Sequence, residues 1–243
     1  MNLLNRIIRI NIHRPITSKL TQLIRNQLEN FSFYQAKVLA VQIDCQGGSV
    51  VQAKQIQYLL QKFAQKQKLP ILCFAGAQVY NSANIILSCA DKIIAANNSE
   101  IGDYTFSGQL WNISELIKKE NLEVINLSHG KYKDRLNPFQ PYKETDKEWL
   151  NNMMKNNEIE LKKKITSNLS KRFINHHEQT DCLDEAFKSS ILTGYQAQKL
   201  KIVDEIGTID EYLQSNYKNM KTIEFFKPQA YNIQQEIIEK LIS

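Results

Sequence analysis

Apolar residues along this chain follow two alternating patterns. Short apolar runs of four to seven residues predict buried strands, and they lie at 7–12, 37–43, 71–75, 92–95 and 123–127. Between and after these runs, apolar residues recur at the spacing of amphipathic helices. Such helices are expected at 17–30, 50–67, 82–90, 114–120, 145–173, 183–189 and 195–200. Strands that alternate with helices predict right-handed crossovers and a parallel sheet with helices on both faces.

The chain contains neither an internal repeat nor a linker rich in Gly, Pro or Ser. One α/β domain over residues 1–215 is therefore the simplest organisation, followed by a tail at 216–243. Within the tail, Ile and Leu recur at helical spacing over 231–242, which predicts an amphipathic helix. We expect this helix to pack on its own domain, with docking onto a partner as the alternative.

The bulk composition is that of a globular protein. Of the 243 residues, 42% are hydrophobic, and no stretch approaches the roughly 18 apolar residues that a membrane-spanning helix needs. The formal net charge is +6, but the Lys residues are scattered, and the run at 162–164 falls on the solvated face of a helical pattern. No signature of a nucleic-acid-binding fold occurs. We therefore expect neither a transmembrane segment nor a nucleic-acid partner.

The cysteines and histidines do not form a metal-binding pattern. The four cysteines, at positions 45, 73, 89 and 182, lie far apart and form no C-x-x-C pair. The neighbouring His176 and His177 have no Cys or carboxylate at the spacing of a metal site. This usage suggests a reducing compartment, and we expect neither a structural metal nor a cofactor.

The N-terminal segment has the composition of a mitochondrial transit peptide. Its first 28 residues hold five Lys and Arg and no Asp or Glu. The same segment contains the apolar run at 7–12, which is expected to be the first strand of the fold. We therefore predict a mitochondrial protein that retains this segment, with the cytoplasm as the alternative location.

Four short motifs follow one another along the chain. They read Ile-Asp-Cys-Gln-Gly-Gly-Ser-Val at 43–50, Gly-Ala-Gln-Val-Tyr-Asn-Ser-Ala-Asn at 76–84, Ala-Asp-Lys-Ile-Ile at 90–94 and Gly-Lys-Tyr-Lys-Asp at 130–134. In this order and at this spacing they resemble the signal peptide peptidase A family, serine proteases with a Ser–Lys dyad. That family carries S-P-G-G-S-V, G-x-x-A-A-S-G-G-Y-Y, A-A-D-K-I and S-G-x-x-K-D. A closing segment at 192–207 resembles its T-G-x-x-A-x-x-L-x-L-V-D-E-I-G.

The resemblance covers about residues 35–215. It implies the fold of the Clp protease and crotonase superfamily, in which repeated ββα units surround a parallel sheet, here with a long helical region toward the C-terminus. Members of that superfamily form rings or stacked oligomers. The resemblance therefore also implies that this chain assembles with itself or with other subunits.

The glycine pair after the second apolar run is a candidate oxyanion site. Glycines there allow backbone N–H groups to approach a substrate carbonyl, and each such donor typically lowers the barrier by ~3–4 kcal/mol. The resemblance implies that the N–H of Gly48 is one donor. The other would be the N–H of the residue after the nucleophile, which is Ala83 if Ser82 is the nucleophile.

The nucleophile position has two possible alignments. A Ser hydroxyl attacks only when a base takes its proton, and the resemblance assigns that role to Lys133. Alignment without gaps places Asn81 on the family's Ser, and Asn cannot be this nucleophile. The alternative alignment uses Ser82 but needs one insertion and one compensating deletion. We favour Asn81, because one substitution is simpler than two compensating changes in length.

A second departure from the family pattern concerns the support of the Lys. The family has T-G-S-I-G after the A-D-K-I strand, and its Ser helps to hold the Lys. Here the segment reads Ile-Gly-Asp-Tyr-Thr at 101–105, so Asp103 replaces that Ser. A carboxylate beside Lys133 would favour the ammonium form, which is not a base. We therefore hypothesise an Asp103–Lys133 ion pair as a remnant of the site.

Two functions remain open on the sequence. The first is a catalytically inactive relative that acts as a structural or binding subunit of a larger assembly and keeps a peptide groove near Gly48. The alternative is an active endopeptidase with Ser82 and Lys133 as its dyad, degrading membrane-derived or signal peptides. A crotonase-type acyl-CoA enzyme is a distant third, because the motifs at 130–134 and 192–207 are those of the peptidases.

Overall fold

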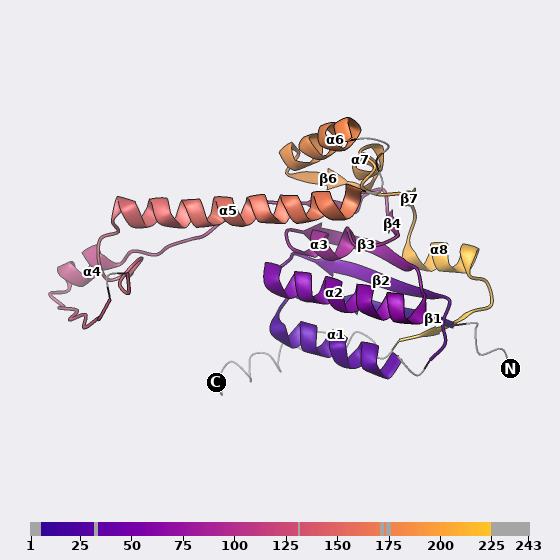
Figure 1. Cartoon of the computed structure of the whole chain (residues 1–243). Coiled ribbons are helices and arrows are strands. Elements are labelled where there is room, and N and C mark those ends of the chain that lie inside the picture. Colours follow the sequence, from indigo (N-terminus) through magenta and orange to yellow (C-terminus); the bar gives the residue numbers. More distant parts are fainter. Residues whose placement is uncertain (1–5, 32–33, 131, 171–172, 174–175, 225–243) are drawn as a thin grey trace. The chain divides into compact units, whose positions relative to one another are not determined.

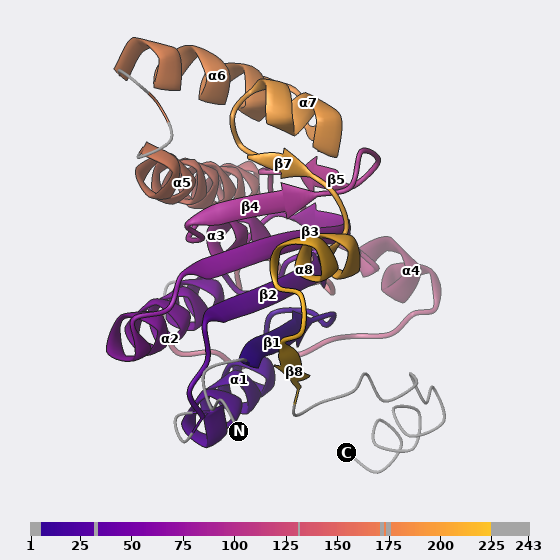
Figure 2. The same cartoon turned by 90° about the vertical axis from the view of Figure 1, so that its right-hand side faces the viewer.

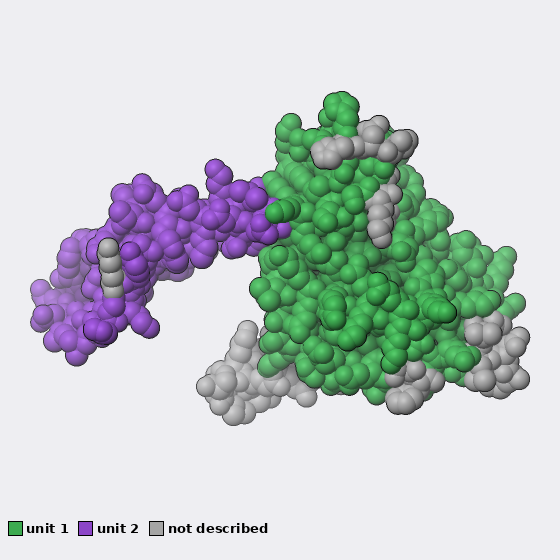
Figure 3. Space-filling model, viewed as in Figure 1, with its two compact units in different colours: residues 1–104, 161–243 green, residues 105–160 purple. Residues whose placement is uncertain are grey.

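The computed structural model describes residues 6–31, 34–130, 132–170, 173 and 176–224. Contacts divide the chain into two compact units, coloured separately in Figure 3. Unit 1 combines residues 1–104 with 161–243, and unit 2 is residues 105–160. Helix α5 (Glu144–Leu169) belongs to both, because its last turns are in unit 1. Each unit is described by itself below.

Unit 1 is built on an eight-stranded sheet with the order β6-β5-β3-β2-β1-β8, on which β4 also pairs with β3 and β7 with β4. All pairs are parallel except β5 with β6, which confirms the predicted α/β class. The strands are β1 (Arg6–Ile12), β2 (Val38–Cys45), β3 (Ile71–Tyr80), β4 (Lys92–Ala95), β5 (Glu100–Gly102), β6 (Ile191–Thr193), β7 (Glu205–Ile206) and β8 (Lys221–Ile223).

Helices cover both faces of this sheet (Figures 1 and 2). Successive strand residues point to opposite faces, and one face packs against Ile209 and Leu213 of α8. Helices α1, α2 and α3 lie on the other face, over side chains such as Leu39 and Val41 that are fully buried. The helices of unit 1 besides α5 are α1 (Ser18–Phe31), α2 (Val50–Gln67), α3 (Ala83–Leu87), α6 (His176–Lys188), α7 (Gly194–Lys199) and α8 (Ile209–Asn216).

Strand β3 runs from the core to the site and, besides β2, pairs with two strands in succession. Its first half pairs with β4, from Leu72 opposite Lys92 onward. Its last residues pair with β5, where Tyr80 lies opposite Gly102. The sequence predicted only the first half, because the continuous apolar run is interrupted at Gly76 and Gln78 in the second half.

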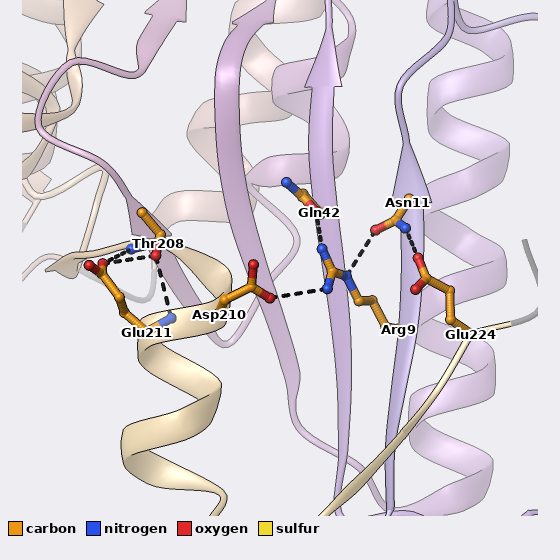
Figure 4. A network of polar contacts seen from close by, with 7 residues as sticks. All are labelled: Arg9, Asn11, Gln42, Thr208, Asp210, Glu211 and Glu224. Carbon is orange, nitrogen blue, oxygen red and sulfur yellow. Dashed lines mark hydrogen bonds and ion pairs between the residues drawn. The ribbon is translucent and has the colours of Figure 1, made fainter. Parts of the chain in front are cut away.

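A polar network ties the C-terminal part of unit 1 to the sheet (Figure 4). The guanidinium of Arg9 in β1 donates to Asn11 Oδ1 at 3.2 Å, to Gln42 Oε1 at 2.6 Å and to Asp210 Oδ1 at 3.2 Å. Asn11 in turn donates to Glu224, just after β8. Strand β8 pairs with β1, so the expected tail from residue 216 contributes to the sheet at least through Ile223. The helix expected at 231–242 lies outside the described residues.

Unit 2 contains α4 (Ser114–Lys119) and the first part of α5. Within it, the guanidinium of Arg135 lies 4.2 Å from the centre of the Tyr132 ring and 4.9 Å from that of Trp149. Arg135 Nε also lies 3.1 Å from a carboxylate oxygen of Asp146. A cavity of about 280 Å³ opens beside this cluster.

One predicted strand is wrong. Residues 123–127 were expected to join a sheet, but residues 122–129 have no regular secondary structure. The side chains of Ile125 and Leu127 are 76% and 91% exposed. An apolar run forms a strand only when a neighbouring strand pairs with its backbone, and the described residues provide none here. Among the described parts of the chain, no helix has both the length and the hydropathy of a bilayer-crossing segment.

Candidate functional site

The glycine turn after β2 requires both of its glycines. Gly47 and Gly48 have φ values of +100° and +142°, which other residues rarely adopt. Backbone bonds hold Gly48 against Ile16: Ile16 N donates to Gly47 O and Ser49 N to Ile16 O, each at 2.9 Å. A Cβ at Gly48 would lie 2.5 Å from Ile16 O. The turn therefore presents backbone groups alone where an oxyanion site was predicted.

A second turn, between β3 and α3, brings Asn81 to this place. Asn81 has a φ of +48°, a left-handed conformation that Asn tolerates better than most residues. Its N–H lies within bonding distance of two carbonyls, Gly102 O at 3.0 Å and Asp103 O at 3.1 Å. A Cβ at Gly47 would lie 3.0 Å from Asn81 Cβ, so the two turns are in contact. A sharp strand-to-helix turn of this kind is where hydrolases expose a nucleophile.

Ser82 follows Asn81 and is fully buried. Its hydroxyl donates to Gly48 O at 3.1 Å, which uses its single proton. Its backbone N–H donates to Asn81 Oδ1 at 2.7 Å. Ala83, the expected second oxyanion donor in the Ser82 alignment, opens α3 and is also fully buried. The structure thus brings Gly48, Asn81, Ser82 and Ala83 together in one place.

Asn84 is a residue of this site that the sequence analysis missed. It is 3% exposed, and its side-chain amide lies within bonding distance of Gly102 O at 2.9 Å and of Val79 O and Asn81 O, each at 3.2 Å. One amide therefore fixes the ends of β3 and β5 to the Asn81 turn. The signal was an Asn inside the apolar pattern of a predicted buried helix, where a polar side chain needs hydrogen-bond partners.

Asp103 reaches the site through its backbone. It has a φ of +48°, follows the last residue of β5, and its N–H donates to Ser190 O. Its carbonyl accepts from Asn81 N, and its side chain is half-buried. Asp103 and Asn81 are therefore neighbours in the structure.

Lys133 belongs to unit 2, where it lies exposed in a turn. Its N–H donates to Gly130 O at 3.2 Å. The next residue, Asp134, accepts from Asn126 Nδ2 at 2.6 Å and from Ser128 Oγ at 2.5 Å, which fixes the backbone of this segment. Because Asp103 and Ser82 are in unit 1, the pairing of Lys133 with either residue stays a prediction.

Two titratable side chains next to the turns have raised pKa values. A hydrogen bond to Glu100, followed by burial, raises the pKa of Tyr80 to about 12. Burial raises the pKa of the Cys45 thiol, which also donates to Arg14 O at 3.1 Å. Both groups are thus held neutral at physiological pH. Among the described residues, no group of three or more His, Cys, Asp or Glu could hold a metal ion.

Comparison with known proteins identifies the family. A sequence model of peptidase family S49 matches residues 63–224, about two thirds of the chain. The chain belongs to peptidase family S49. This confirms the resemblance to signal peptide peptidase A on which the site residues were assigned, and the matched region includes Asn81, Ser82, Asp103 and Lys133.

Individual S49 relatives are distant. A protein of Methanocaldococcus jannaschii that carries the name of a protease is 24% identical over 188 residues, 75% of this chain and 58% of that protein. A protein of Haemophilus influenzae named as the protease SohB is 25% identical over 176 residues, 72% of this chain and 46% of that protein. The chain thus spans about half the length of these relatives.

A solved structure shares the S49 fold. It is a serine-to-alanine mutant of the 1510-N membrane-bound stomatin-specific protease, with a TM-score of 0.55 and 15% identity. The similarity covers 93% of this chain and 98% of that chain. At this identity the likeness establishes the fold, and the activity of this chain has to be argued from its own residues.

Proposed function

We propose that this chain is a catalytically inactive S49 protein that serves as a structural or binding subunit of a larger assembly. The observation that carries the proposal is the state of Ser82, whose hydroxyl is fully buried and donates to Gly48 O at 3.1 Å. A serine nucleophile must instead direct its proton to a base. Asn81 takes the turn between β3 and α3, where a nucleophile would be exposed.

The backbone donors of the site support the same proposal. If Asn81 stands at the nucleophile position, the oxyanion donor after it is the N–H of Ser82. That N–H donates to Asn81 Oδ1 at 2.7 Å. A substrate oxyanion would have to displace this bond, because a single N–H makes one good hydrogen bond. The amide of Asn81 thus acts as an internal substitute for a ligand at this donor.

An active Ser82–Lys133 endopeptidase acting on membrane-derived or signal peptides is the alternative. The observation in its favour is the position of Ser82 beside the glycine turn, within 3.1 Å of Gly48 O. In this reading, Ser82 would change rotamer to meet Lys133, and Gly48 and Ala83 would supply the oxyanion donors.

A fluorophosphonate probe distinguishes the two functions, because it labels serines that are activated by a base. We expect no labelling of the full chain and no hydrolysis of a fluorogenic peptide library. The matched control is Ser88→Ala, which removes another buried hydroxyl near the site. Labelling or hydrolysis that Ser82→Ala abolishes and Ser88→Ala retains would establish the endopeptidase and end the proposal.

A gain-of-function variant tests the alignment itself. The double variant Asn81→Ser with Asp103→Ser returns both family residues and removes the carboxylate expected beside Lys133. If the gap-free alignment is right, the probe should label this variant, and a further Lys133→Ala change should abolish the labelling. A double variant that folds and is not labelled would contradict the assignment of Asn81.

We expect the assembly to consist of several copies of this chain. Assembly with other subunits is the alternative outcome of the test. Unit 2 is rich in exposed apolar side chains: 12 of the 16 large hydrophobic residues exposed among the described residues lie between Leu110 and Ile159. Exposed apolar surface of this density is typical of interaction sites. Light scattering after gel filtration should give a mass that is a multiple of 28.2 kDa. A monomer at micromolar concentration would refute self-assembly.

A mitochondrial location completes the proposal. The acid-free segment at the N-terminus supports it, and β1 lies inside the sheet between β2 and β8. Removal of that strand would expose two sheet neighbours, so the segment has to be retained. Import into isolated mitochondria without a change in chain length is expected, whereas failure to be imported would favour the cytoplasm.

A further inference from the structure

The net positive charge of this protein arises in its first 90 residues, where acidic side chains are scarce. They contain ten Lys and Arg but only two acidic residues, Glu29 and Asp44. The remaining residues, 91–243, hold 21 basic and 23 acidic side chains. The net charge of +6 therefore arises from the segment that forms β1–β3, α1 and α2. Charge asymmetry of this kind indicates a polyanionic partner.

Helix α2 shows the asymmetry most clearly. Its side chains at Lys54, Tyr58, Lys62 and Lys66 follow one another at four-residue spacing and so form one ridge. They are half-exposed or exposed, and Lys62 Nζ lies 5.8 Å from the centre of the Tyr58 ring. The helix contains no acidic residue. Like charges four residues apart repel each other, and α2 carries no carboxylate that could form an ion pair with them.

Helix α5 of the same protein has a different charge pattern, one typical of a solvated helix face. Helix α5 carries five acidic and five basic residues over 26 positions. Mixed signs favour solubility and local ion pairs, and α5 contains such a pair between Lys147 and Glu144 at 2.6 Å. The one-sided charge of α2 is therefore a property of that surface and not of the chain as a whole.

Helix α1 lies beside α2 on the same face of the sheet (Figures 1 and 2) and extends the charge. We define the basic surface as the exposed and half-exposed cations of these two helices and of the residue that caps α2. They are Lys19, Arg25, Lys54, Lys62, Lys66 and Lys68. Two large hydrophobic side chains of α2 are also exposed, Val51 with 71% and Tyr58 with 60% of its area.

We propose that the basic surface binds an anionic lipid surface. Five of its six cations are Lys, whose compact ammonium suits a diffuse negative field, whereas the planar fork of Arg is suited to individual phosphates and bases. Lys clusters are attracted to membranes that contain anionic lipids. Tyr58 and Val51, exposed beside the lysines, add aromatic and apolar area that a membrane surface can bury. This binding is independent of whether the S49 site is active.

The test is co-sedimentation of the full chain with vesicles of phosphatidylcholine, with or without phosphatidylserine, at about 0.15 M salt, where screening is physiological. We expect binding only to the vesicles with phosphatidylserine. The triple variant Lys54→Gln/Lys62→Gln/Lys66→Gln should bind about fivefold more weakly for each lost charge, or roughly 100-fold in total.

The matched control is Lys163→Gln/Lys188→Gln/Lys218→Gln, which removes the same charge at exposed positions outside the basic surface. It should bind within about twofold of the unchanged protein, and circular dichroism should show that both triple variants are folded. An equal loss in the two variants, or equal binding to vesicles without phosphatidylserine, would overturn the proposal. Tighter binding to a single-stranded RNA than to the vesicles, lost in the α2 variant, would also overturn it and assign the surface to nucleic acid.

Discussion

Replacement of Ser82 by Ala separates the two functions through stability as well as activity. In the structure the Ser82 hydroxyl is a structural donor, because it is fully buried and bonds the carbonyl of Gly48 at 3.1 Å. If Ser82 were a nucleophile, its hydroxyl would serve the substrate. Loss of such a group typically leaves stability unchanged or raises it, since active sites trade stability for function.

The magnitude follows from the partners of the bond. A typical intramolecular hydrogen bond contributes about 0.5–1.5 kcal/mol, and an acceptor left buried without a partner costs about 1–3 kcal/mol. Gly48 itself is exposed, so water can reach its carbonyl once the hydroxyl is gone, and the lower part of that range applies. The void left by one oxygen atom adds little. We expect Ser82→Ala to lower the free energy of unfolding by about 1–2 kcal/mol.

The assay has to report on unit 1. Both tryptophans, Trp111 and Trp149, are in unit 2, so fluorescence would follow the wrong unit. Urea unfolding followed by circular dichroism is the suitable measurement, with a shift in melting temperature of about 2–4 °C per kcal/mol as a second readout. Ser215→Ala on the exposed face of α8 is the control and should change stability by less than about 0.5 kcal/mol. A Ser82→Ala protein as stable as the control would refute the structural role of this hydroxyl.

Three further predictions concern the elements around the site. Gly48→Ala would place a Cβ 2.5 Å from a backbone oxygen at a φ of +142°. Circular dichroism melts should therefore show a loss of about 3 kcal/mol or more in the free energy of unfolding. Gly207→Ala is the control and should be nearly neutral, because the nearest atom to its Cβ would lie at 3.8 Å. Arg9→Met should lower the free energy of unfolding in urea by about 1–3 kcal/mol, because it removes the side-chain hydrogen bonds of Arg9 to Asn11 and Gln42. Asp210→Asn should cost less than about 1 kcal/mol, because Asp210 is 83% exposed. Equal costs for the two variants would contradict this ranking. A carboxylate hydrogen bond raises the pKa of Tyr80 from 10.0 to about 12, so the folded protein holds this proton more tightly than the unfolded chain. The resulting stability is present below pH 10 and is lost between pH 10 and about 12, and alkaline melts of Tyr80→Phe should lack this part of the loss.

The long elements of the fold could be predicted from the sequence because local signals and burial agree there. Helix α2 occupies the predicted residues 50–67, since Ser49 caps its start and Lys68 ends it in a left-handed conformation. The strands β5, β6, β7 and β8 were missed because two or three residues carry no period. The false strand at 123–127 shows the opposite case, in which an apolar run has the right composition but no neighbour to pair with.

The site could be predicted in part: residues within the sequence motifs were assigned, whereas contacts between distant segments were not. The resemblance to the peptidase family assigned Gly48, Asn81 and Asp103 to one site, and in the structure the turns that carry them meet where parallel strands end. The contact of Ile16 with Gly48 and the three bonds of Asn84 were not predictable, since both depend on how backbone segments meet in space. The sequence signals only that a buried Asn84 needs hydrogen-bond partners, and it does not say which groups they are.

The hydrogen bonds of this site would hold its geometry even in the absence of a nucleophile. Ser82 Oγ joins the turn after β3 to the turn after β2, and Asn84 joins it to the end of β5. Both side chains are buried, and their bonds stabilise the sheet edge whether or not a substrate is cleaved. Selection for folding alone would therefore preserve the site's shape. A match to the S49 pattern is thus compatible with either function, and it is the occupancy of the donors, by Asn81 Oδ1 and by Gly48 O, that favours the inactive one.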